Sequence, residues 1–188
     1  MRIITDHWIW QNTLSTELCQ HLIKEYFIKE EATEALIGGE MTPGVVEPET
    51  RVTNVCWIPA DDLISVVLMN FALRANTKAG WNFDVDLIRP VQLAEYLPGG
   101  HYTWHIDTSV TEVDELNTQR KLSVVALLSS PDDYEGGGLE LNRENTNVMP
   151  NGQGSVYVFP SILEHRVLPV TSGVRYSLTG WCRGPAFR

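Results

Sequence analysis

The second half of the chain consists of short runs of alternating or β-branched residues, each followed by a turn signal. Eight such runs occur between residues 81 and 182: WNFDVDLI, PVQLAEY, HYTWHID, RKLSVVALL, GLELN, GSVYVF, HRVLPV and RYSLTGWC. Segments rich in glycine, proline and aspartate separate them, among them PGG, PDDYEGGG, PNGQG and TSG. Strands at this spacing predict a β core of the sandwich, jelly-roll or barrel type.

The N-terminal part has a different pattern, which predicts two helices packed outside this sheet. Ser15 can cap a helix in LSTELCQHLIKEYFIKE. Its expected apolar face is formed by Leu18, Leu22 and Tyr26. RVTNVCWIP (51–59) alternates as a strand does, and Pro59 with Asp61 opens a second helix in DDLISVVLMNFALRAN.

The length of 188 residues fits one domain of ordinary size. No repeat and no linker divides the chain, so we expect a single domain over residues 1–188. Residues 1–80 would supply helical support and a lid, and residues 81–188 the β core. Residues 38–50 carry glycine, proline and acids without any period, which predicts a loop at the mouth of a site. The polar segment 108–119 is expected to flank the same mouth.

The charge balance argues against nucleic acid as a partner. The chain has 14 basic and 24 acidic residues, a net charge of −10, whereas a phosphate backbone selects for the opposite sign. Its three cysteines show no paired spacing, which favours free thiols in a reducing compartment. No apolar run reaches 18 residues, and no signal-peptide pattern opens the chain. We therefore expect a cytoplasmic location and no membrane partner.

Two of the five histidines lie in the stretch EYLPGGHYTWHIDTS, residues 95–109. Side chains two apart on a strand point to the same face, so His105 and Asp107 can offer a nitrogen and an oxygen to one point. Taken alone, the two residues are better explained as an ordinary hydrogen-bonded pair. A jelly roll can, however, bring His165 opposite His105. Two histidines and one carboxylate leave open positions on a metal, which favours iron(II).

Arg175 begins the last β run, ten residues after His165. A guanidinium inside an apolar β core is costly unless an anion pairs with it. A dicarboxylate cosubstrate would provide that anion through a bidentate, charge-assisted contact. The sequence therefore predicts an iron site beside an anion site, because a His-x-Asp motif, a distant histidine and an arginine follow in this order, each on its own β run.

These segments resemble the iron(II)- and 2-oxoglutarate-dependent dioxygenases, specifically their prolyl 4-hydroxylase branch. The matching pieces are YLPGGHYTWHID, RKLSVVALLSSPDDYEGGGLEL, PNGQGSVYVFPSILEHRVLPV and GVRYSLTGW, which together cover residues 91–181. RVTNVCW at 51–57 adds a weaker match. The resemblance implies an α+β, mainly β fold: a double-stranded β-helix (jelly roll, cupin-like) with N-terminal helices packed on the sheet.

The resemblance also implies roles for individual residues. The iron ligands would be His105, Asp107 and His165. The 2-oxoglutarate site would include Arg175, which binds the distal carboxylate, together with Tyr96, Tyr102 and Thr179. Contacts to a substrate peptide would come from Arg120, Trp181 and Arg51, the last with Thr53 on a lid. Without the resemblance, the aromatic residues among these fit a core, and Arg51 and Arg120 fit surface charges.

One position departs from the pattern. Related enzymes often have a tyrosine seven residues after the position of Arg120, and it donates to the same carboxylate as the arginine. This chain has Leu127 there. The second hydrogen bond must then come from another residue, with Tyr96 and Thr103 as candidates, or cosubstrate binding is weaker.

The resemblance implies hydroxylation of an unactivated C–H bond, with succinate and CO2 as co-products. The cofactors would be Fe(II), 2-oxoglutarate and O2, with ascorbate as an accessory reductant. The expected substrate is a proline in a protein or peptide. Three alternatives stay open: the same chemistry on a free amino acid or small molecule, a non-catalytic jelly-roll module, and a zinc hydrolase. A nucleic-acid demethylase of this fold would have a second arginine six residues after Arg175, where this chain has Trp181.

Overall fold

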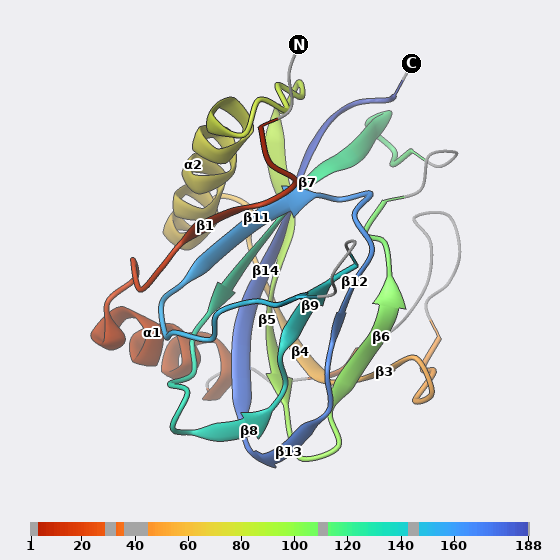
Figure 1. Cartoon of the computed structure of the whole chain (residues 1–188). Coiled ribbons are helices and arrows are strands. Elements are labelled where there is room, and N and C mark those ends of the chain that lie inside the picture. Colours follow the sequence, from red (N-terminus) through yellow and green to blue (C-terminus); the bar gives the residue numbers. More distant parts are fainter. Residues whose placement is uncertain (1–3, 29–32, 36–44, 109–112, 143–146, 188) are drawn as a thin grey trace.

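Two facing β-sheets form the body of the protein in a computed structural model (Figure 1). The structure describes residues 4–28, 33–35, 45–108, 113–142 and 147–187. The expected mouth segments 38–50 and 108–119 therefore lie partly outside the described residues. The mainly β jelly roll predicted from the sequence is confirmed by this arrangement.

The larger sheet contains seven strands among the described residues, in the order β1-β11-β7-β14-β5-β4-β2. Their bounds are β1 Trp8–Trp10, β11 Val156–Pro160, β7 Thr118–Leu127, β14 Arg175–Pro185, β5 Leu87–Tyr96, β4 Asn54–Ile58 and β2 Thr33–Glu34. The long strands β14, β5 and β7 lie at its centre. Every pairing in this sheet is antiparallel.

The smaller sheet has the order β10-β9-β12-β6-β3. Its strands are β10 Asn147–Val148, β9 Leu139–Leu141, β12 His165–Val167, β6 His101–His105 and β3 Arg51–Val52. A separate pair joins β8 Tyr134–Gly136 to β13 Val170–Gly173. The chain passes from the smaller sheet to the larger one between Val52 and Asn54, so the strand expected over 51–59 is divided between the two sheets.

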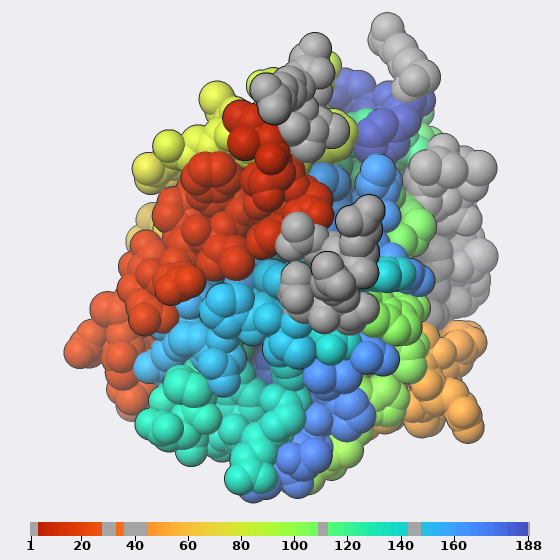
Figure 2. Space-filling model, viewed as in Figure 1, coloured from red at the N-terminus to blue at the C-terminus, as the bar shows by residue number. Residues whose placement is uncertain are grey.

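Both predicted helices are present and cover the outer face of the larger sheet. Helix α1 (Thr16–Leu22) begins as expected, because the Ser15 hydroxyl accepts a hydrogen bond from the Leu18 N–H at 3.2 Å. It continues into a π-helical turn, η1 (Ile23–Ile28). Helix α2 (Leu63–Lys78) is capped by Asp62, one residue later than the sequence suggests. Figure 2 shows the N-terminal segment (red) at the surface, next to a light-blue segment from the second half of the chain. Strand β1, within the N-terminal segment, pairs with β11.

Alternation along the central strands divides the buried residues into two apolar clusters. Leu93 and Leu178 point outward and pack with Leu68 of α2. Ala94 and Leu127 point inward, between the two sheets. This division explains why the long strands carry apolar residues on both faces: helices cover one side and the smaller sheet covers the other.

One predicted strand is wrong. Residues 81–86 of the expected run WNFDVDLI have no strand structure, and β5 begins only at Leu87. Trp81 is instead buried in the outer cluster, and its indole N–H donates to the Thr5 carbonyl at 2.7 Å. Tertiary packing of this one large side chain therefore overrides the local β pattern.

Candidate metal and cosubstrate site

Strand pairing in the smaller sheet brings His105 and His165 together. The two residues lie opposite each other in the antiparallel pair of β6 and β12. Asp107 lies two residues after the end of β6, and its carboxylate oxygens lie 3.6 Å from His105 Nε2 and 3.4 Å from His165 Nε2. One ligand atom from each of the three residues lies within 4.8 Å of the others. The sequence prediction that these residues converge is confirmed.

Backbone contacts orient both imidazoles toward the shared point. His105 Nδ1 lies 2.8 Å from the Thr103 carbonyl, and His165 Nδ1 lies 2.9 Å from the Leu163 carbonyl. A carbonyl can only accept, so each Nδ1 carries the hydrogen and each Nε2 presents its lone pair. This is the tautomer a metal requires, held by the kind of outer contact that metal-binding histidines have.

Asp107 is held by a hydroxyl relay from the larger sheet. The Ser123 hydroxyl donates to Asp107 Oδ2 at 2.6 Å and lies 3.0 Å from the Ser161 hydroxyl. Burial alone would raise the pKa of the Asp107 carboxyl, but His165, His105 and Ser123 together hold this pKa well below its usual value. Burial lowers the pKa of His165. One carboxylate and two imidazoles form a donor set that fits a divalent metal such as iron(II).

The predicted site residues of β14 form a line along the inner face of the larger sheet. Arg175, Ser177, Thr179 and Trp181 alternate inward, and residues paired with them point the same way. Trp181 pairs with Ser123, the residue that contacts Asp107. The end of the line at Trp181 is therefore the end next to the candidate metal ligands, called the metal end below. Thr179 and Ser177 occupy the rows between Trp181 and Arg175.

Arg175 forms the far end of this line and is 3% exposed. Its Nη1 donates to the Ser177 hydroxyl at 3.0 Å, and its guanidinium lies over the Tyr96 ring at 5.1 Å. Within the described part of the chain, no aspartate or glutamate forms an ion pair with it. A buried guanidinium without an acidic partner is a strong attractor for an anionic ligand.

Tyr102 links the metal end to a second arginine. Strand β6 has one extra residue relative to β12 between the His165 and Val167 pairings, and this irregularity lets Tyr102 stack on His105. The two rings are 3.5 Å apart and nearly parallel. Arg51 lies over the Tyr102 ring at 4.8 Å, and its buried Nε and Nη2 atoms have no hydrogen-bond partner.

Arg120 and Trp181 also lie together, as the proposed substrate contacts should. The Arg120 guanidinium is 4.3 Å from the Trp181 ring, and its Nη1 donates to the Asp107 carbonyl at 3.1 Å. The buried Trp181 indole N–H has no acceptor. Thr53, predicted to lie on a lid with Arg51, is buried instead. Its hydroxyl donates to the Glu95 carbonyl of β5 at 2.7 Å, so this side chain fastens the segment between β3 and β4 to the larger sheet.

The structure adds two residues that sequence reasoning missed. Ser123 is the only hydroxyl in the apolar part of RKLSVVALL, which could have marked it as a buried polar contact. Tyr134 lies in PDDYEGGG, which the turn signal assigned to a loop, yet it belongs to β8 and lies beside Arg175. Thr103, suggested as a partner for the distal carboxylate, is exposed, so the structure gives that suggestion no support.

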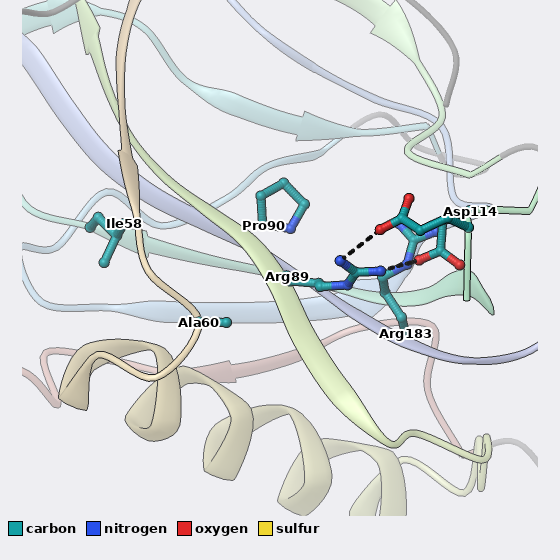
Figure 3. Close-up of a pocket in the computed structure, with 7 residues that line it drawn as sticks. Ile58, Ala60, Arg89, Pro90, Asp114 and Arg183 are labelled. Carbon is teal, nitrogen blue, oxygen red and sulfur yellow. Dashed lines mark hydrogen bonds and ion pairs between the residues drawn. The ribbon is translucent and has the colours of Figure 1, made fainter. Parts of the chain in front are cut away.

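A second pocket lies apart from the three candidate ligands (Figure 3). Its lining residues are Ile58, Ala60, Arg89, Pro90, Asp114, Glu115 and Arg183. Asp114 pairs with Arg89 at 2.9 Å and with Arg183 at 3.0 Å across it. Its charges are therefore largely satisfied within the protein, unlike Arg175.

Comparison with known proteins agrees with this site. The sequence profile described as the 2OG-Fe(II) oxygenase superfamily matches residues 91–183. A PKHD-type hydroxylase from Synechococcus sp. is 39% identical over 123 residues, covering 63% of this chain and 54% of that protein. Another from Sphingopyxis alaskensis is 35% identical over 135 residues, covering 70% and 62%. The chain thus spans about half to two thirds of the length of these relatives.

Solved structures share the fold at lower sequence identity. A Pseudomonas putida prolyl-4-hydroxylase superposes with a TM-score of 0.70 at 22% identity, covering 95% of this chain and 92% of that one. A Trichoplax adhaerens prolyl hydroxylase, solved with a peptide fragment of a hypoxia inducible factor, gives 0.74 at 20% identity, covering 94% and 83%.

Fold and site together are those of the jelly-roll oxygenases: two histidines and one carboxylate converge, and a buried arginine lies without an acidic partner among the described residues. The chain belongs to the 2OG-Fe(II) oxygenase superfamily, and its fold is that of the prolyl 4-hydroxylase-like branch. The cofactors of this family are Fe(II), 2-oxoglutarate and O2. Among the described residues, no helix is long and apolar enough to cross a membrane.

Proposed function

We propose that the protein is an iron(II)- and 2-oxoglutarate-dependent hydroxylase that acts on a proline within a protein or peptide. The observation that carries the chemistry is one row of inward-facing side chains along β14 with two ends. His105, Asp107 and His165 converge at one end, and Arg175 lies without an acidic partner at the other. When bound there, iron(II) and 2-oxoglutarate supply the oxidising power: substrate, O2 and 2-oxoglutarate give hydroxylated substrate, succinate and CO2.

The protein's own residues would bind and orient these partners. His105, Asp107 and His165 hold the metal on one side and leave its other positions open. Arg175 pairs with the distal carboxylate of 2-oxoglutarate, and Thr179 lies between this contact and the metal end. Ser123 fixes the Asp107 carboxylate, so the ligand set does not need to reorganise when the metal binds.

Unsatisfied donors on the substrate side support a peptide. Arg51 Nε and Nη2 and the Trp181 indole N–H are buried without acceptors, although a buried unpaired donor costs about 1–3 kcal/mol. An extended peptide presents carbonyl oxygens at regular spacing and could satisfy all three. Proline is proposed as the hydroxylated residue because the solved structures that share the fold are prolyl hydroxylases, and one of them was solved with a peptide. A free amino acid is the second candidate and would leave most of these donors unpaired.

A coupled turnover assay tests this proposal. The protein is incubated with Fe(II), 2-oxoglutarate, ascorbate and O2, together with either proline-containing peptides or free proline. Succinate and a mass gain of one oxygen are then measured. We expect peptide-stimulated succinate production that His165→Ala abolishes and that His21→Ala, a change at an exposed helical histidine, leaves intact. Equal turnover by His165→Ala would refute the metal assignment, and stimulation by free proline alone would refute the peptide substrate.

A further inference from the structure

The far end of the proposed cosubstrate site lacks a hydrogen-bond donor that related enzymes have. Leu127, the residue at that position, is buried and lies opposite Ser177, two residues along β14 from Arg175. Its side chain cannot donate to a carboxylate. An anion held by Arg175 alone would keep part of its acceptor capacity unsatisfied in a buried site, which is costly.

Tyr134 reaches the guanidinium from a different element. Strand β8 pairs with β13, Tyr134 lying opposite Gly173, two residues before Arg175. The following turn needs Gly137: φ is +61°, and a Cβ there would lie 2.9 Å from Arg175 Cδ and 3.3 Å from Tyr134 Cε2. The glycine therefore allows the tyrosine ring and the arginine side chain to approach each other.

Three tyrosines surround Arg175, and their hydroxyl groups differ in what they can still donate to. Tyr96 presents its ring face to the guanidinium. Tyr157 donates its hydroxyl to the Pro150 carbonyl, so its proton is already used. Tyr134 lies beside Arg175, since a Cβ at Gly137 would contact both side chains, and a guanidinium can only donate to the tyrosine oxygen. Its proton is therefore left for another acceptor.

We propose that Tyr134 donates its hydroxyl proton to the distal carboxylate of 2-oxoglutarate, replacing the tyrosine that related enzymes have at the position of Leu127. Arg175 would then contact both the tyrosine oxygen and the carboxylate, which fixes the hydroxyl in a donating orientation. This inference rests on the proposed function, because it assumes that 2-oxoglutarate binds at Arg175. It assigns the donor to a strand that the sequence pattern describes as a turn.

Binding measurements with two keto acids separate this role from a structural one. The Fe(II)-loaded protein is titrated anaerobically with 2-oxoglutarate and, separately, with pyruvate, which lacks the distal carboxylate, and the charge-transfer absorbance gives each Kd. A charge-assisted hydrogen bond corresponds to about a 10- to 100-fold change in Kd. We expect Tyr134→Phe to weaken 2-oxoglutarate binding by this factor and to leave pyruvate binding unchanged.

Tyr176→Phe is the matched control. The Tyr176 hydroxyl also forms a hydrogen bond, to the Glu95 carboxylate at 2.6 Å. Tyr176 is next to Arg175 in the sequence, but its side chain lies on the opposite face of β14. This variant should bind both keto acids as the wild type does. Pyruvate binding also reports that Tyr134→Phe is folded, and Tyr134→Leu serves if the phenylalanine does not pack.

The outcomes distinguish the role of Tyr134 from the proposed function of the protein. Wild-type affinity for 2-oxoglutarate in the Tyr134 variants would overturn the role of Tyr134 while leaving the proposed function intact. Equal weakening of pyruvate would also overturn it, since the effect would not belong to the distal carboxylate. A wild-type protein that binds neither keto acid would overturn the proposed function itself.

Discussion

At the scale of single residues, the candidate centre depends on contacts that lie outside its three ligands. Asp107 accepts a hydrogen bond from Ser123, and the two histidines donate to backbone carbonyls. Such contacts set the direction of each lone pair before a metal arrives. Their loss should therefore reduce metal affinity without removing any ligand.

Ser123→Ala tests this outer contact. We expect the Kd of Fe(II), measured by anaerobic titration, to rise about 10- to 100-fold, because the Asp107 carboxylate loses its fixed orientation. Ser65→Ala is a suitable control. Ser65 belongs to α2, on the outer side of the larger sheet; it is also fully buried, and its hydroxyl donates to the Pro59 carbonyl. If both variants bind Fe(II) as tightly as the wild type, Ser123 has no part in the metal site.

The sequence was sufficient for the residues that belong to one short motif or to a regular strand. His105 and Asp107 are two apart, so their common direction follows from strand geometry, and His165 and Arg175 stand at the starts of recognisable β runs. Ser123 and Tyr134 were not predictable in this way. Their contacts join distant strands, and nothing in their own sequence neighbourhoods specifies which strand lies opposite.

At the scale of elements, Asp114 connects the turn before β7 to two other strands. Its carboxylate accepts from the Leu116 N–H at 3.1 Å, the Thr118 N–H at 2.8 Å and the Thr118 hydroxyl at 2.8 Å. It also pairs with Arg89 of β5 and Arg183 of β14 (Figure 3). The start of β7, which carries Arg120 and Ser123, is therefore fixed by one acidic side chain.

These contacts make the contribution of Asp114 depend on pH. Burial opposes the charge, but the hydrogen bonds from Thr118, the charge of Arg183 and the hydrogen bond from Arg89 lower the pKa of Asp114 to about 2 from its ordinary value of 3.8. Because the folded state lowers this pKa, the stabilisation is present above about pH 4 and is lost as the pH falls toward 2. This pH range is set by the two pKa values of Asp114, one for the unfolded and one for the folded state.

Asp114→Asn should consequently destabilise the protein by about 2 kcal/mol at pH 7 and by much less near pH 2.5. The measurement is the urea midpoint at each pH, compared with the wild type at an unchanged m-value. Asp132→Asn removes an exposed carboxylate and should change the midpoint little at either pH. A loss at Asp114 that is the same at both pH values would contradict the argument.

The elements themselves were predicted unevenly, for a physical reason. Both helices and the central strands follow from periodicity, because each buries one or two faces in a regular way. The strand expected over 81–88 is wrong because Trp81 is buried among helix residues rather than in a sheet. The break at Thr53 was equally hidden, since a change of sheet leaves the alternation of RVTNVCW intact.

At the scale of the whole molecule, the proposed metal connects the two sheets. His105 and His165 belong to the smaller sheet, whereas Asp107 is fastened to the larger one through Ser123. Arg175, on the larger sheet, would add a second connection through the cosubstrate. The unfolded chain cannot bring these four residues together, so ligands should bind the folded state selectively and stabilise it.

Fe(II) and 2-oxoglutarate, each added anaerobically at about 100 times its Kd, should therefore raise the thermal midpoint. A single ligand at that excess contributes about 2.7 kcal/mol, which corresponds to about 5–10 °C for a chain of this length. EDTA should reverse the shift, and His165→Ala should show none. A shift of equal size in His165→Ala would mean that the metal binds elsewhere, and the connection between the sheets would then need another explanation.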